Sequence, residues 1–198
     1  MVKLLDIMLG RLSKHRAYAG IAWEANRERP ATEYGTRHND SREIQRVNPV
    51  AQLLSSEDIL LDLDASTKQG VFEDVGRLFE RRHGLPRTQV VESLNAREKL
   101  GSTGLGQGVA LPHARIKNLT QAVAAFVRLK LPIAFDAPDA KPVWAMLILL
   151  VPERATEQHL QILAEFAQMF GDSHFRERLR MCDDVGAVYQ LMSEWPTA

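Results

Sequence analysis

Hydrophobic residues recur at helical spacing in two neighbouring segments of the chain after Asn48. Ser66-Thr-Lys-Gln69 has the pattern of a capping box and predicts the start of the first helix, which Gly84 and Pro86 should end. The buried face of this helix is predicted to comprise Val71, Phe72, Val75, Leu78 and Phe79. A second helix is predicted from about Thr88 to Lys99, with an inward face of Val90, Val91 and Leu94.

Three later segments have the apolar pattern of β-strands, namely Gly108–Leu111, Ala122–Leu129 and Val143–Val151. The third is apolar on both faces, which is typical of a strand at the centre of a covered sheet. Residues 130–142 contain prolines at positions 132, 138 and 142 and are predicted to form a connection between strands.

The C-terminal part of the chain predicts three helices. Thr156 should begin the first, and Gly171 should close it. One face of that helix would comprise Leu160, Leu163, Phe166, Ala167 and Phe170. Ser173 and Asp183 are predicted N-caps of the last two helices. The last helix should bury Val185, Val188, Leu191 and Met192. The order of elements predicts an α/β fold, a single domain with a mixed β-sheet flanked by helices.

Residues 1–47 differ in character from residues 48–198, which we take as the folded domain. Leu4, Leu5, Met8, Leu9 and Leu12 share one helical face, and a polyampholyte from Asn26 to Arg46 follows. This second part has too few apolar residues to bury a core. We expect the extension to be a disordered tail or the product of a start codon assigned too far upstream. The functional alternative is a partner-binding helix on a tether.

Composition narrows the class of protein. The 198 residues carry a net charge of zero, which offers no overall electrostatic case for binding nucleic acid or membranes. Cys182 is the single cysteine, so an internal disulfide framework is excluded. The longest apolar run, Val143–Val151, is too short to span a bilayer. With no export signal recognisable in the sequence, the expected location is the cytoplasm.

The segment from Arg97 to Arg115 contains the candidate chemistry. It holds four glycines, a Ser102-Thr103 pair, and His113 directly after a proline. Glycines allow backbone N–H groups to surround an anion. The spacing of Gly104, Gly106 and Gly108 fits neither a Walker loop nor a dinucleotide turn. A tight helix-to-strand connection would explain the glycines equally well.

Two histidines are candidates for a shared site. A neutral imidazole is a competent nucleophile toward phosphorus, and His113 has a fixed backbone and Arg115 two residues away. His159 lies in the first turn of a predicted helix, just after the central strand, where ligands bind in open α/β sheets. A structural role for His113 and a two-histidine metal site are the alternatives, although no third ligand has suggestive spacing.

At these residues the chain resembles a known family. Arg97-Glu-Lys-Leu-Gly-Ser-Thr-Gly-Leu-Gly-Gln-Gly-Val-Ala-Leu-Pro-His113 is similar to the signature of the EIIA domains of the phosphoenolpyruvate-dependent phosphotransferase system, fructose/mannitol type (type 2). The Gly-Ser-Thr-Gly form resembles the nitrogen-regulatory members in particular. The likeness extends from about Asn48 to the last helix and includes Pro132-Ile-Ala-Phe-Asp136 and Leu150-Val-Pro152.

The resemblance implies roles for individual residues. His113 corresponds to the phosphorylated histidine, His159 to the assisting one, and Arg97 to the arginine that stabilises charge. Phosphate-binding positions would be Ser102, Thr103, Gly104, Gly106 and Arg115, although lysine is common at the last of these. The implied donor is an HPr-like phosphocarrier, and neither metal nor cofactor is needed.

Two functions follow from the resemblance. In the first, the chain is a regulatory phosphoryl carrier whose phosphorylation state selects its partners. In the second, it is the EIIA component of a fructose/mannitol-type transport system and passes phosphate to a separate EIIB. Both describe a component of a phosphohistidine relay rather than a conventional turnover enzyme. A binding module that is never phosphorylated is a third class, against which the intact His113 loop argues.

Overall fold

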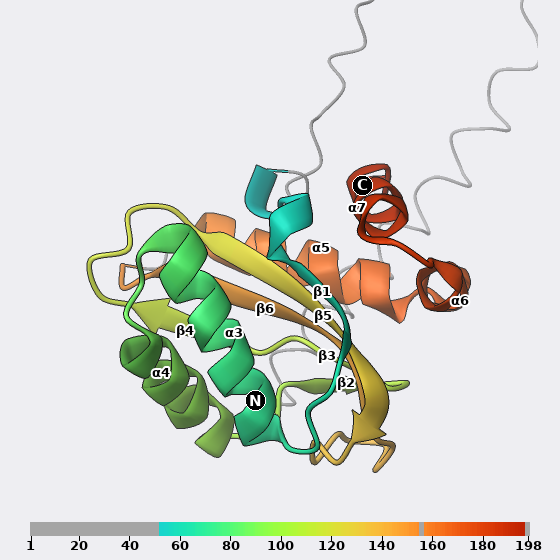
Figure 1. The fold of residues 1–198 in the computed structure, drawn as a ribbon, viewed down its shortest axis with the longest axis horizontal. Coiled ribbons are helices and arrows are strands. Elements are labelled where there is room, and N and C mark those ends of the chain that lie inside the picture. The colour runs from blue at the N-terminus through green and yellow to red at the C-terminus, as the bar shows by residue number, and fades with distance from the viewer. Residues whose placement is uncertain (1–51, 155–156, 197–198) are drawn as a thin grey trace, which may run out of the picture. The chain divides into compact units, whose positions relative to one another are not determined.

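A six-stranded mixed sheet with helices on both faces forms the core of the protein (Figure 1). The computed structural model describes residues 52–154 and 157–196, so the predicted extension, residues 1–47, lies outside the described residues. The strand order is β1-β5-β6-β3-β2, and β4 also pairs with β6. Helices α3 and α4 cover one face, and α5, α6 and α7 lie on the other side. The prediction of an α/β fold with a mixed sheet is confirmed.

Strand β6, Val143–Pro152, is the centre of the sheet, as its sequence predicts, and all its residues but Pro152 are buried. It runs antiparallel to β5, Val123–Ile133, and parallel to both β3, Val109–Ala110, and β4, His113–Ile116. Because both short strands keep the same register against β6, they form one line of chain interrupted at residues 111–112.

The remaining strands lie at the two edges of the sheet. Strand β1, Ile59–Leu63, pairs in parallel with β5, and β2, Gly104–Gly106, pairs antiparallel with β3. Strand β5 extends to Ile133, so the prediction that residues 130–142 are all connection is wrong at its start. Ile133 pairs with Val143 after a register shift, which accommodates Pro132 although proline has no N–H to donate.

Helix α3, Lys68–His83, buries the five residues predicted for its inner face and ends at Gly84 in the left-handed conformation (φ 66°). Its N-cap is Thr67, whose hydroxyl oxygen accepts a hydrogen bond from Gly70 N at 3.1 Å. The predicted capping box is therefore wrong by one residue. Gln69 instead donates its side-chain amide to Glu73.

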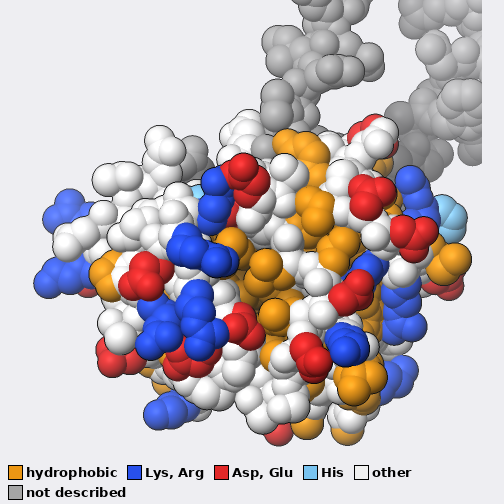
Figure 2. Space-filling model, in the orientation of Figure 1, with side chains coloured by type: hydrophobic (Ala, Val, Ile, Leu, Met, Phe, Trp, Pro, Cys, Tyr) orange, Lys and Arg blue, Asp and Glu red, His pale blue; other side chains and the backbone are white. Residues whose placement is uncertain are grey.

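Helix α4, Arg87–Lys99, packs against α3 and carries Arg97 in its last turn. It begins one residue earlier than predicted and buries Val90, Val91 and Leu94 as expected. On the surface, basic and acidic side chains intermingle over these two helices, with hydrophobic side chains gathered in a band beside them (Figure 2). This mixture agrees with the zero net charge and gives no single-sign patch on this face.

Helices α5 (Glu157–Gly171), α6 (Ser173–Met181) and α7 (Val185–Ser193) complete the fold. Asp172 and Asp184 are the N-caps of α6 and α7, so the predicted caps Ser173 and Asp183 are wrong by one residue each. Leu160, predicted on the buried face, is 53% exposed. The predicted first residue of α5, Thr156, lies outside the described residues. No helix in the described ranges is long and apolar enough to cross a membrane.

Candidate functional site

His113 is the first residue of β4 and is held by two hydrogen bonds to its ring. Its Nδ1 lies 3.0 Å from the carbonyl oxygen of Leu111. Because a carbonyl can only accept, Nδ1 must be the protonated nitrogen. Nε2 therefore keeps its lone pair, and Arg97 donates Nε–H to it at 3.2 Å. The structure thus presents a neutral imidazole with a defined tautomer and a guanidinium at its nucleophilic nitrogen.

The surroundings of His113 keep the ring neutral. Burial lowers the pKa of His113 from its ordinary 6.5, the hydrogen bond to Leu111 opposes this, Arg97 lowers the pKa further and Glu98 raises it. The net effect is a lowered pKa, because loss of hydration disfavours the charged form. At pH 7 the imidazole is consequently available as a nucleophile.

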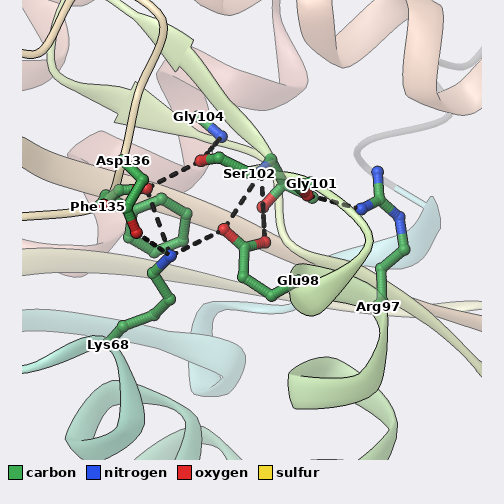
Figure 3. Close-up of polar contacts among 9 residues, drawn as sticks. Lys68, Arg97, Glu98, Gly101, Ser102, Gly104, Phe135 and Asp136 are labelled. Carbon is green, nitrogen blue, oxygen red and sulfur yellow. Dashed lines mark hydrogen bonds and ion pairs between the residues drawn. The ribbon is translucent and has the colours of Figure 1, made fainter. Parts of the chain in front are cut away.

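Arg97 connects helix α4 to the glycine loop as well as to His113. Its Nη1 donates to the carbonyl oxygen of Gly101 at 2.9 Å, a contact drawn in Figure 3. Arg97 and His113, the first and last residues of the family signature, are thus joined by a hydrogen bond between their side chains. The guanidinium retains N–H groups beyond these two bonds for an anion.

The glycines of the loop are required by backbone geometry. Gly108 has φ 78°, and a Cβ there would overlap the Trp144 ring. A Cβ on Gly104 would lie 2.8 Å from that of Ala137. Gly106 pairs with Val109 at the turn end of the β2–β3 hairpin, away from His113 along the strand. The interpretation as a tight helix-to-strand connection therefore suffices for the glycines, and contacts of Gly104 and Gly106 with phosphate stay predictions.

Ser102 and Thr103 use their hydroxyls within the protein. Ser102 Oγ donates to the Phe135 carbonyl at 2.7 Å and accepts from Gly104 N at 3.1 Å (Figure 3). Thr103 Oγ1 donates to Glu98 Oε2 at 2.6 Å, and the Thr103 amide also donates to the Glu98 carboxylate. A phosphate contact by either hydroxyl stays a prediction and would require it to exchange its present partner.

Two charged residues that the sequence analysis did not single out complete this network. The carboxylate of Glu98, 7% exposed, lies 3.0 Å from the ammonium group of Lys68. Lys68 comes from the first turn of α3 and also reaches the Phe135 carbonyl, the Asp136 carboxylate and the Phe135 ring (Figure 3). The position of Glu98 beside Arg97 in the family signature was the one available signal, and nothing in the sequence pointed to Lys68.

The other two predicted site residues, Arg115 and His159, come from β4 and α5. Ala114 and Ile116 contribute to the core beneath α3 and α4, so alternation along β4 puts His113 and Arg115 on the opposite face. Arg115 is exposed. His159 is the third residue of α5, whose Phe166, Met169 and Phe170 pack on this face. The side chain of His159 lies outside the described residues, as does its relation to His113.

Known proteins share the part of the chain that contains these site residues. The profile of the family described as "Phosphoenolpyruvate-dependent sugar phosphotransferase system, EIIA 2" matches residues 52–195. The chain belongs to this family. The matched range includes every residue of the site described above. The resemblance drawn from Arg97–His113 is confirmed.

Proteins similar to this chain include nitrogen regulatory proteins. A nitrogen regulatory protein of Pseudomonas aeruginosa is 39% identical over 144 residues, which are 71% of this chain and 92% of that protein. The crystal structure of the nitrogen regulatory protein IIA-Ntr from Neisseria meningitidis is 44% identical, with a TM-score of 0.70, covering 73% of this chain and 99% of that one. The mannitol IIA of Escherichia coli shares the fold, at 22% identity and a TM-score of 0.60 over 70% of this chain and 98% of that one.

Proposed function

We propose that this EIIA-family protein is a phosphoryl carrier and regulator of the nitrogen-related phosphotransferase system, accepting a phosphoryl group on His113 from an HPr-like phosphocarrier. The observation that supports this most is the geometry of the ring. Nδ1 is engaged by Leu111 at 3.0 Å, which leaves Nε2 as the nucleophilic atom. Its neighbour Arg97 supplies positive charge where the phosphoryl group would arrive.

The transfer step needs no further reactant. The Nε2 lone pair attacks the phosphorus of a phosphohistidine on the donor, forming a P–N bond as the donor's P–N bond breaks. The released electron pair returns to the donor imidazole, and Nδ1 of His113 keeps its proton and its bond to Leu111. The Arg97 guanidinium turns from the imidazole to the phosphoryl oxygens, whose charge it offsets.

Other groups complete the proposed phosphate site. Arg115 is exposed on the same face of β4 as His113 and can reach an incoming anion. We assign His159 as the assisting histidine because α5 covers this face of the sheet. Leu100, exposed directly after α4, offers the donor an apolar contact beside Arg97. The cytoplasm, where a free thiol at Cys182 is stable, remains the inferred location.

The EIIA component of a fructose/mannitol-type transport system is the alternative, and the sugar phosphotransferase description of the family favours it. The regulatory assignment is preferred because of the similarity to nitrogen regulatory proteins at 39% and 44% identity. The two functions share phosphorylation of His113 and differ in what happens next. In transport the phosphoryl group passes to EIIB, whereas in regulation it alters binding to partner proteins.

The full chain, incubated with phosphoenolpyruvate, enzyme I and an HPr-like carrier, should gain one acid-labile phosphoryl group by mass spectrometry. His113→Ala should abolish this, whereas His174→Ala, which removes an exposed histidine on α6, should leave it unchanged. Phosphorylation of the His113→Ala variant would contradict the proposal. Adding a fructose/mannitol-type EIIB then separates the two functions, because onward transfer to it would favour transport.

A further inference from the structure

A chain of short contacts runs from the interior of the loop to the imidazole of His113. The Glu98 carboxylate receives both the amide and the hydroxyl of Thr103, the hydroxyl at 2.6 Å. The carbonyl of Thr103 in turn accepts the amide of Leu111 at 3.0 Å. The carbonyl of Leu111 is the group that holds His113 Nδ1. Hydrogen bonds of Thr103 and then of Leu111 therefore link Glu98 to the imidazole of His113.

The negative charge of Glu98 is compensated by the ammonium group of Lys68. The side chain is 7% exposed, and a buried carboxylate is costly unless it is paired and hydrogen-bonded. Lys68 pairs with it at 3.0 Å, while the Lys68 ammonium also donates to the Phe135 carbonyl. That carbonyl accepts the Ser102 hydroxyl as well. The ion pair thus ties helix α3, the end of α4, the glycine loop and the segment after β5 together (Figure 3).

We propose that Glu98, neutralised by Lys68, is a positioning residue for phosphoryl transfer, fixing the loop that sets the tautomer and orientation of His113. This inference rests on the proposed function, because it concerns the reactivity of the same histidine. Glu98 touches neither the imidazole nor the arriving phosphoryl group. It acts through Thr103 and Leu111, and through the C-terminal turn of α4 that carries Arg97.

The charge of Glu98 gives the proposal a second observable consequence. Among the charged groups that act on the ring, Arg97 lowers the pKa of His113 and Glu98 raises it. Glu98→Gln keeps the size of the side chain and an acceptor for Thr103 but removes this opposing charge. We therefore expect the pKa of His113 to fall further in the variant. This shift follows from the lost charge alone. The readout of positioning is therefore the tautomer of His113, which a role limited to stability would leave unchanged in the folded protein.

The test measures three quantities on the full chain. These are the initial rate of phosphoryl acceptance from the HPr-like carrier, the pKa and tautomer of His113 from ring-nitrogen NMR, and the melting temperature. Glu98→Gln and Lys68→Met should each slow acceptance by about 10- to 100-fold, the range expected when a reacting group is misplaced. In both variants, ring-nitrogen NMR should also show a signal from the Nε2–H tautomer of His113, in addition to the Nδ1–H tautomer. Lys68→Arg, which keeps the cation, should retain most of the rate.

Lys130→Met is the matched control, because Lys130 pairs with Asp64 at 3.3 Å but both side chains are largely exposed, at 61% and 79%. It should leave all three quantities near those of the wild type. Either a rate within twofold of wild type or an unchanged His113 tautomer in Glu98→Gln would overturn the positioning role. If the wild type accepts no phosphoryl group, the proposed function fails, whereas the NMR readout still decides whether Glu98 positions His113.

Discussion

Arg97 and His113 meet at the junction of helix α4, the glycine loop and strand β4, where Arg97 Nε–H points at the Nε2 lone pair of His113 at 3.2 Å. The fifteen residues between them, which include strands β2 and β3, bring the two side chains together. The arginine is thus a hydrogen-bond donor to the imidazole, and in the proposed function its charge would offset that of the phosphoryl group.

Arg97→Gln tests this pairing. Because the positive charge of Arg97 lowers the pKa of His113, the variant should raise that pKa and slow phosphoryl acceptance by about 100-fold, as expected when a stabilising donor is lost. Ring-nitrogen NMR and transfer assays measure the two effects. Arg77→Gln, which removes an exposed arginine that pairs with Asp74 on α3, should change neither. A lower pKa in Arg97→Gln would contradict the assigned electrostatics.

Protonation of His113 should make folding pH-dependent in a defined direction. The folded pKa lies below the unfolded value of about 6.5, so between these values the unfolded chain binds more protons. The contribution of His113 to stability is therefore present above pH 6.5 and is lost as pH falls toward the folded pKa. Urea unfolding from pH 8 to pH 5 should show wild type losing more stability than His113→Gln. Parallel curves for the two proteins would exclude this linkage.

Gly108→Ala should destabilise the β2–β3 hairpin. The substitution imposes a side chain on a residue with φ 78° and directs its Cβ into the Trp144 ring. Left-handed backbone and overpacking together should cost about 2–5 kcal/mol in the free energy of unfolding. Gly171→Ala is the matched control, because a Cβ there meets open space at the end of α5. Chemical denaturation of both variants checks the difference, and equal stabilities would show that the hairpin tolerates a side chain.

Thr67→Ala should cost about 1 kcal/mol of stability through loss of the α3 N-cap. The Thr67 hydroxyl oxygen accepts the Gly70 amide at 3.1 Å, whereas no side-chain cap bond involves Ser66 in the described part of the chain. Ser66→Ala is thus the natural comparison and should be close to neutral. Thermal or urea unfolding distinguishes the two variants. A larger loss of stability for Ser66→Ala would show that Ser66 is the N-cap, as the sequence predicts.

Several features were predictable because local chemistry specifies them. The apolar spacing of Val71 to Phe79 gave the buried face of α3, and the continuous apolar run from Val143 gave the central strand. The helix caps were misplaced by one residue at Thr67, Asp172 and Asp184, because neighbouring Ser, Asp and Thr side chains compete for the same role and backbone geometry decides between them. Strands β1, β2 and β4 were missed, since their short patterns become strands only through pairing with β5, β3 and β6, respectively.

The sequence by itself determined the fold class, the family and the candidate nucleophile, because hydrophobic period and the Arg97–His113 signature are properties of contiguous residues. Only the tertiary structure decided which contacts the residues of that signature make. It assigned the His113 proton to Nδ1, engaged the Ser102 and Thr103 hydroxyls within the loop, and placed Lys68 against Glu98. Lys68 and Glu98 are thirty positions apart in the chain, so their contact arises from the packing of α3 on α4 rather than from any local pattern.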